Sequence, residues 1–220
     1  MDFKAAIFDL DGTLVDSQTA WKSCYAKTLA SIGCTLTDDE FELIYRMTSD
    51  ETWEYFRKKY ETQNHEGKIS FETLMRNYES EIKNQYAFEI KEKPNALEYV
   101  KMLHNSGIPM CVATLTPTEL AEITLKRIGF SSYLKFIITG DDVGRSKRFP
   151  DIYLTAAKRL GYTPYETAVF EDCPTAIETA HKAGFIVCAV AELHQNNNEI
   201  YSYCRLRING FGEIIQGFKG

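Results

Sequence analysis

Two aspartates stand one residue apart near the start of the chain, in the stretch AIFDLDGT at residues 6–13. The apolar residues before Asp9 are typical of a buried strand, so Asp9 and Asp11 would lie where that strand ends. Gly12 allows the backbone to turn sharply after them. A hard divalent cation with oxygen ligands, Mg²⁺ above all, would offset the crowded charge and leave Asp9 able to act as a nucleophile on phosphorus. The alternative is a turn whose acids are simply solvated.

Three further groups suited to phosphoryl transfer follow later in the chain. Thr114 and Thr116 end a strand-like run directly before a predicted helix N-terminus, where hydroxyls and unpaired backbone N–H groups can bind phosphate. Lys147 precedes another predicted helix and could neutralise a phosphoryl group. Glu171 and Asp172 stand at the end of a further strand-like run. An acid pair, a hydroxyl corner, a cation and a second acid pair have the composition of a phosphoryl-transfer site.

Buried strands and amphipathic helices must bring these groups together. Continuous apolar runs, which suit central parallel strands, recur along the chain. They cover residues 4–8, 108–113, 135–139, 167–170 and 185–190. Helical patterns alternate with them, opened by Pro94 and Pro117 and continued over 151–160 and 175–183. This alternation predicts a doubly wound, Rossmann-like α/β core with a parallel sheet. A last short strand and a turn are expected over 207–215.

Residues 18 to about 86 interrupt the alternation, because they contain helical patterns and no convincing strand. The predicted helices cover 21–31, 38–46, 51–60 and 71–86, the last with apolar residues on one face, and a polar loop is expected at 61–68. The sequence therefore predicts a small α-helical cap domain, residues 17–90, inserted after the first strand of a core formed by 1–16 and 91–220. Such an insert would lie above the carboxyl end of the sheet, where open α/β sheets bind ligands.

Composition limits the classes of protein. The 220 residues include 25 Lys plus Arg and 31 Asp plus Glu, a net charge of −6, so no basic excess is available to neutralise a nucleic acid. No apolar run approaches the roughly 20 residues of a membrane span, and the first residues do not read as a secretory leader. Six cysteines without paired spacing favour reduced thiols and a cytoplasmic protein. The oligomeric state stays open, a monomer included.

The motifs, taken in order, resemble those of the haloacid dehalogenase (HAD) superfamily. The residues that carry the resemblance are Asp9 with Asp11, Thr114, Lys147, and Glu171 with Asp172. The resemblance covers nearly the whole chain, from Lys4 to at least Val190. The helical insert after the first motif resembles the cap of the β-phosphoglucomutase and phosphoglycolate-phosphatase branch.

The resemblance implies a Mg²⁺-dependent phosphatase that hydrolyses a small phosphorylated metabolite through a phospho-aspartyl intermediate. It implies that Asp9 attacks phosphorus, while Asp11 protonates the leaving oxygen and then activates water. It also implies that Thr114 and Lys147 hold the phosphoryl oxygens. The implied metal ligands are Asp9, the backbone carbonyl of Asp11, Asp172, and Glu171 through a water molecule.

The chain departs from the family pattern at several places. The residues after Lys147 are RFPD (148–151), where the family commonly has Pro-x-Pro-Asp, which changes the rim of the pocket. Cys173 replaces a serine after the second acid pair, and a thiol is the weaker hydrogen-bond donor. Asp50 stands where the mutase places a substrate-recognising arginine, with Arg46 slightly earlier.

Two residues of the insert are candidate substrate contacts. Arg46 is a cation that could bind a second phosphate, with an ordinary surface charge on a cap helix as the alternative. Trp21 could contact the substrate if the first cap helix begins near Ser17, with packing inside the cap as the alternative.

Three other functions stay open. A sugar phosphomutase would share the intermediate but return the phosphoryl group to sugar, and the missing cap arginine argues against it. A dehalogenase of this superfamily lacks the second aspartate, so Asp11 argues against that activity. A non-catalytic HAD-fold binding protein would bind Mg²⁺ without turnover, although every motif position carries competent chemistry.

Overall fold

The computed structural model describes residues 3–45, 47, 49–62, 69–190 and 198–218. The chain divides into two compact units. The core unit consists of Met1–Asp16 and Lys91–Gly220, and the insert is Ser17–Ile90. Most of the predicted polar loop at 61–68 lies outside the described residues, and helix α3 extends to Thr62.

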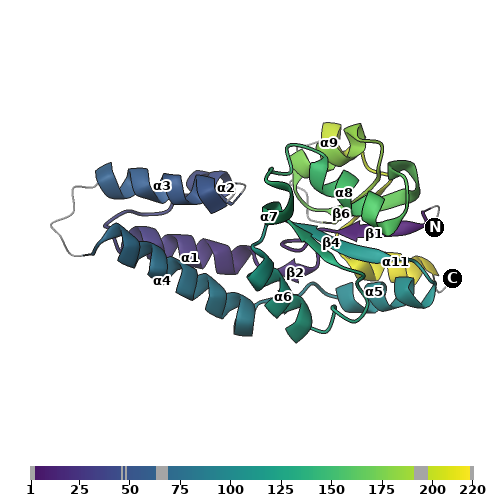
Figure 1. Cartoon of the computed structure of the whole chain (residues 1–220), viewed down its shortest axis with the longest axis horizontal. Coiled ribbons are helices and arrows are strands. Elements are labelled where there is room, and N and C mark those ends of the chain that lie inside the picture. Colours follow the sequence, from purple (N-terminus) through teal and green to yellow (C-terminus); the bar gives the residue numbers. More distant parts are fainter. Residues whose placement is uncertain (1–2, 46, 48, 63–68, 191–197, 219–220) are drawn as a thin grey trace. The chain divides into compact units, whose positions relative to one another are not determined.

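The core unit is built on a six-stranded sheet in the order β5-β4-β1-β6-β7-β8 (Figure 1). Every neighbouring pair of these strands is parallel. The strands are β1 Ala5–Phe8, β4 Met110–Thr114, β5 Ile137–Thr139, β6 Thr167–Glu171, β7 Ile186–Val190 and β8 Leu206–Ile208. The predicted doubly wound α/β fold is confirmed, and the strand order reverses direction beside β1, where such sheets bind ligands.

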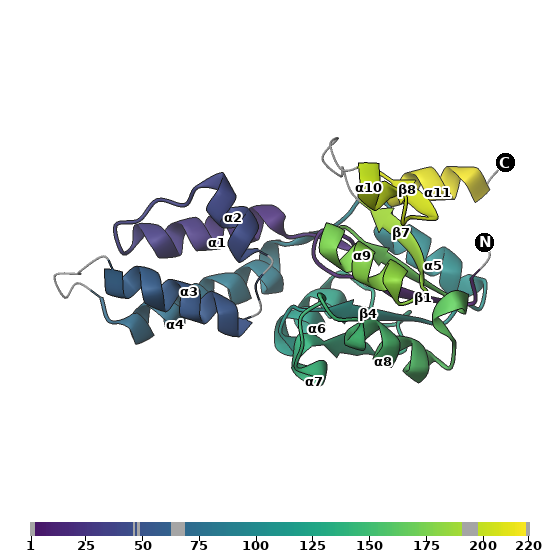
Figure 2. The same ribbon diagram turned by 90° about the horizontal axis from the view of Figure 1, so that it is seen from above.

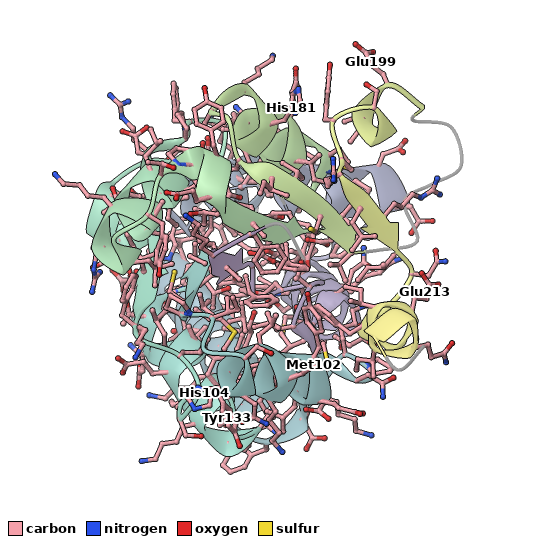
Figure 3. The ribbon with its side chains drawn as sticks, turned by 90° about the vertical axis from the view of Figure 1, so that its right-hand side faces the viewer. Met102, His104, Tyr133, His181, Glu199 and Glu213 are labelled. Atoms are coloured by element: carbon pink, nitrogen blue, oxygen red, sulfur yellow. The ribbon has the colours of Figure 1, made fainter. Side chains whose placement is uncertain are left out.

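Helices cover both faces of this sheet. α8 Asp151–Leu160 and α9 Pro174–Lys182 cover one face, and α5 Ala96–Asn105 and α11 Phe211–Phe218 cover the other (Figures 1 and 2). Figure 3 shows the strands between α9, marked by His181, and α5, marked by Met102 and His104. The shorter or more peripheral helices of this unit are α6 Thr118–Arg127, α7 Gly140–Val143, η2 Pro164–Glu166 and α10 Asn198–Tyr201.

Side chains alternate between the two faces along the central strands. Ile7 of β1 belongs to the apolar cluster beneath α8 and α9. Phe8 faces the other way and stacks on Phe170 with ring centroids 4.6 Å apart. By this period of two, Asp9 returns to the face covered by α8, and so does Glu171 at the end of β6. The strands therefore aim both acids at one helix.

The secondary-structure elements in the described part of the insert are all helices. Its elements are α1 Gln18–Ala30, α2 Asp38–Ile44, α3 Ser49–Thr62, α4 Phe71–Asn84 and the π-helix η1 Gln85–Glu89 (Figure 1). On either side of the insert, β2 Val15–Asp16 and β3 Lys91–Glu92 pair as a short antiparallel ribbon. No helix in the described part of the chain is long and apolar enough to cross a membrane.

The end of the chain differs from its prediction. The segment 207–215 contributes to β8, as expected, but the residues after the strand form helix α11 and not a turn. Two glycines, Gly212 and Gly217, each cost the helix about 1 kcal/mol relative to alanine. Phe211 is fully buried and stacks on Tyr99 with ring centroids 5.3 Å apart. Burial of this apolar face against α5 outweighs the weak helical propensity.

Candidate active site

The first-motif aspartates lie in a tight turn after β1. The backbone N–H of Asp9 donates to the carbonyl of Phe170 at 2.9 Å, which ties the turn to β6, and Gly12 N–H donates to the carbonyl of Val15 at 2.8 Å. Gly12 has a φ of +84°, and a Cβ there would overlap Oδ2 of Asp172. The turn needs glycine both for its left-handed backbone and for this close approach.

Lys147 connects two of the predicted carboxylates. Its Nζ donates to Oδ1 of Asp9 and to Oε1 of Glu171. At most 10% of each of these three side chains is exposed. Burial alone would lower the pKa of Lys147, but the charges and hydrogen bonds of Asp9 and Glu171 outweigh it and raise that pKa. The buried ammonium therefore stays charged.

Glu171 accepts hydrogen bonds from three residues, of which one lies on helix α8 and two lie in loops. Its Oε1 accepts from Lys147 and from the hydroxyl of Tyr153 at 2.6 Å, and its Oε2 accepts from the backbone N–H of Cys173 at 3.2 Å. Burial, followed by the charge of Glu171, raises the pKa of Tyr153 well above its usual value, so the phenol remains a donor. These donors fill most of the acceptor positions of a fully buried carboxylate.

Three carboxylates form a candidate metal centre. Asp9, Glu171 and Asp172 each present an oxygen within 4.8 Å of the other two. Burial raises the pKa of Asp9 well above its usual value, since the attraction of Lys147 does not fully offset it. Burial and the charge of Glu171 likewise raise the pKa of Asp172 to about 8. Ionisation of all the carboxyls in the cluster is therefore unfavourable with one ammonium as the nearby cation, and their oxygen donors fit a hard divalent cation.

Asp11 has different partners. Its Oδ2 accepts the hydroxyl of Thr116, whose backbone N–H donates to Oγ1 of Thr114 at 3.1 Å. Both threonines are buried, whereas Asp11 is half-buried. The hydroxyl of Thr116, which the sequence assigned to a phosphate, is directed at the second aspartate in this structure. The end of β4 therefore orients Asp11.

Residues from all four motifs meet at the carboxyl ends of β1, β4 and β6. Tyr153 joins them, and the sequence did not indicate it. Tyr153 lies next to Ile152 on the apolar face of α8. From the sequence, this position is equally compatible with core packing and with a role in the site. The hydrogen bond from its hydroxyl to Glu171, 18 positions further along the chain, is what separates these two roles.

Cys173 has the chemistry of an unreactive thiol. Burial, followed by the charge of Glu171, raises the pKa of Cys173 to about 11, so the thiol stays protonated at neutral pH. The bond from this residue to Glu171 comes from the backbone N–H. The replacement of the family's serine therefore leaves that contact intact.

The structure describes the surroundings of Trp21, one of the two candidate substrate contacts in the insert, but not those of Arg46. Trp21 donates from Nε1 to the hydroxyl of Tyr86 at 2.8 Å and packs against the ring of Tyr25, with centroids 5.6 Å apart. These contacts lie within the insert and match the packing alternative, and substrate contact by Trp21 stays a prediction. Arg46 lies outside the described residues, and Asp50 is exposed on α3.

Comparison with known proteins identifies the family. The model of the haloacid dehalogenase-like hydrolases matches residues 6–190. The chain belongs to this family. A phosphorylated carbohydrates phosphatase of Thermotoga maritima is 29% identical over 181 residues, which are 82% of either chain. The fructose-1-phosphate phosphatase YqaB of Escherichia coli is 25% identical over 83% of this chain and 93% of its own length.

Solved structures agree with the family. A "putative beta-phosphoglucomutase" from Thermotoga maritima is 26% identical, with a TM-score of 0.79 over 99% of both chains. The predicted family is therefore confirmed, and so is the predicted class of enzyme, a HAD-type phosphatase acting on phosphorylated compounds.

Proposed function

We propose that this protein is a Mg²⁺-dependent phosphatase that hydrolyses a small phosphorylated metabolite through a phospho-aspartyl intermediate on Asp9. The observation that carries the proposal is the buried contact of Asp9 with Lys147 inside a cluster of further carboxylates. An anionic nucleophile approaching a phosphate needs fixed positive charge, and Lys147 supplies part of it. The similar phosphatases act on phosphorylated carbohydrates and on fructose 1-phosphate by name, which supports the substrate class.

The reaction consists of two displacements at phosphorus. First, the carboxylate of Asp9 bonds to phosphorus, the bond from phosphorus to the ester oxygen breaks, and Asp11 gives its proton to that oxygen. Next, Asp11 takes a proton from water, the water oxygen bonds to phosphorus, and the bond to Asp9 breaks. Thr116 orients Asp11 throughout, while Thr114 and Lys147 bind the phosphoryl oxygens.

The metal would be held by the carboxylates of the cluster. Asp9, Asp172 and the backbone carbonyl of Asp11 would bind Mg²⁺, with Glu171 acting through a water molecule. The turn at Gly12 supports this set, because it brings the backbone against Asp172. Bound Mg²⁺ supplies positive charge to the phosphoryl oxygens.

The domain assignment and the compartment belong to the same proposal. Residues 1–16 and 91–220 would form the catalytic domain, and residues 17–90 a cap that excludes competing water. We place the reaction in the cytoplasm, since the six cysteines are free thiols.

The direct test is phosphate release from a panel of small phosphate esters, with Mg²⁺ or with a chelator, by the wild type and by Asp9→Asn. We expect turnover that requires both the metal and Asp9, and the best ester would narrow the substrate. Release that persists in Asp9→Asn would contradict the proposal.

A second candidate is a sugar phosphomutase, favoured by the likeness to the mutase-like structure over the whole chain. It would transfer the phosphoryl group back to sugar and require a catalytic sugar bisphosphate. Metal binding without turnover on any ester would instead indicate a binding protein. The ester panel, run with and without sugar bisphosphates, separates these outcomes.

A further inference from the structure

Tyr153 contacts both partners of the buried ion pair, although it belongs to none of the four motifs. Its hydroxyl donates to Oε1 of Glu171 at 2.6 Å, and its ring lies 5.6 Å from Nζ of Lys147. The side chain is fully buried, and its ring packs against Phe185 in a T-shaped arrangement with centroids 6.1 Å apart. A phenylalanine would fill this apolar space equally well. The hydroxyl is thus explained by its acceptor and not by packing.

The hydroxyl decides how Glu171 can use its two oxygens. A carboxylate offers about four acceptor positions, two on each oxygen. Lys147 and Tyr153 occupy Oε1, while Cys173 occupies one position on Oε2. One position on Oε2 is left, on the carboxylate that also belongs to the metal cluster.

The same hydroxyl controls the competition for Lys147. The ammonium is shared between Asp9 and Glu171. Without the phenol, Lys147 would be the remaining donor to Oε1 of Glu171 among the described residues. The buried charge on Glu171 would then attract the ammonium more strongly. Lys147 would then be drawn away from Asp9, the proposed nucleophile.

We propose that Tyr153 is a positioning residue that holds Oε1 of Glu171, keeps Lys147 on Asp9 and leaves only Oε2 available toward a divalent cation. The inference rests on the proposed function for its catalytic consequence. Its consequence for metal binding does not depend on any substrate.

The test compares Tyr153→Phe with Tyr55→Phe. Tyr55 donates to Glu40 beside Lys59 in the insert and is no part of the candidate site, so this control removes the same hydroxyl from the same kind of trio. A hydrogen bond to a charged group corresponds to about tenfold or more in an equilibrium. We expect Tyr153→Phe to lose about tenfold in kcat with KM nearly unchanged, and Tyr55→Phe to lose neither.

Calorimetric titration with Mg²⁺ provides a readout without turnover. We expect Tyr153→Phe to change the Mg²⁺ affinity several-fold relative to the wild type, and Tyr55→Phe to leave that affinity unchanged. Equal affinity in Tyr153→Phe and in the wild type would overturn the inference, and so would a wild type that binds no divalent cation. A wild type that binds Mg²⁺ but releases no phosphate would contradict the proposed function alone.

A double variant shows whether Tyr153 acts through Glu171. We expect Tyr153→Phe to change Mg²⁺ affinity less than about twofold when it is added to Glu171→Gln, because coupled residues are not additive. A full, additive change in the Mg²⁺ affinity of the double variant would mean that the phenol acts elsewhere, and would overturn the proposal.

Discussion

The same trio of residue types, glutamate with lysine and tyrosine, occurs in both units of the molecule. In the insert, Oε1 of Glu40 accepts from Lys59 at 2.5 Å and from the hydroxyl of Tyr55 at 2.6 Å. The ammonium of Lys59 lies 5.7 Å from the ring of Tyr55, and Oε2 of Glu40 accepts from the backbone N–H of Thr37 at 3.3 Å. This arrangement caps the N-terminus of α2 and connects α3 to it through the hydrogen bonds of Tyr55 and Lys59.

In the core unit the trio is Glu171, Lys147 and Tyr153, with the same bonds to Oε1 and a backbone N–H on Oε2. The surroundings differ. In the core unit, Asp9 and Asp172 add two more carboxylates to the trio. In the insert, Glu40 pairs with Lys59, and its side chain is partly exposed. Local hydrogen bonding does not mark a functional site by itself. The candidate site differs from the trio in the insert by its additional buried carboxylates.

The largest difference between the trios should appear when each loses its lysine. Lys147→Met leaves several buried carboxylates without a cation, and breaking a buried pair in this way costs about 3–5 kcal/mol. We expect turnover to fall at least about a thousandfold, because the same charge serves the transition state. Lys59→Met should cost at most about 1 kcal/mol and leave turnover unchanged.

Phosphate release and chemical unfolding of both variants measure these effects. Comparable losses of stability in the two variants would contradict the comparison, because the lysine of the core trio would then contribute no more to stability than the lysine of the trio in the insert.

Gly12→Ala tests the turn that supports the core cluster. The added methyl group meets both a left-handed backbone and the carboxylate of Asp172, so we expect a loss of about 2–3 kcal/mol and about a hundredfold in turnover. Gly161, with a φ of +87° and no atom within 4 Å of the position that a Cβ would take, provides the control. Gly161→Ala should cost only about 1 kcal/mol, from backbone strain alone, and keep full activity.

Metal addition should stabilise one trio and not the other. A cation bound only by the folded state at a hundred times its dissociation constant adds about 2.7 kcal/mol. We expect Mg²⁺ to raise the thermal midpoint of the wild type and of Glu40→Gln alike, and to leave Asp172→Asn nearly unchanged. An undiminished shift in Asp172→Asn would place the metal elsewhere.

The smallest expected effect is the acid sensitivity of the insert. The hydrogen bonds of Lys59, and then of Tyr55, lower the pKa of Glu40 to about 2. Because this pKa is depressed in the folded state, the unfolded state binds more protons, and stability is lost as the pH falls from about 4.5 toward 2. Allowing for partial exposure, we expect this carboxylate to contribute about 1–2 kcal/mol.

Unfolding free energies at pH 3 and at pH 6 measure this contribution. Glu40→Gln should be less stable than the wild type at pH 6 and closer to it at pH 3. If the difference in unfolding free energy between Glu40→Gln and the wild type were the same at both pH values, the charge of Glu40 would not contribute to the stability of the insert.

The motif residues could be predicted from the sequence because each follows an apolar run that must become a buried strand. Strand ends of a parallel sheet share an edge, so the positions of Asp9 and Glu171 after two such strands predict that they lie close together. Tyr153 could not be predicted, because a tyrosine on an apolar helix face looks the same with or without an acceptor. The contact of Thr116 with Asp11 joins positions 105 apart and depends on how the turn after β4 is folded.

The predicted type of element was wrong where tertiary packing outweighs local propensity. Helix α11 contains glycines that favour a turn, yet Phe211 fixes it against α5 by burying its ring. In the core strands, by contrast, propensity, apolar pattern and burial all agree. The predicted strands therefore match the structure closely, while the last helix does not.

The central claim, that Asp9 receives the phosphoryl group, is tested most directly by trapping the intermediate in Asp11→Asn with p-nitrophenyl phosphate. This leaving group needs no proton, whereas hydrolysis of the intermediate needs the base that Asp11→Asn lacks. We expect a burst of nitrophenol and, after acid quench and peptic digestion, one phosphoryl group on the peptide that contains Asp9. Turnover without a covalent adduct, or a phosphoryl group on another residue, would contradict this claim.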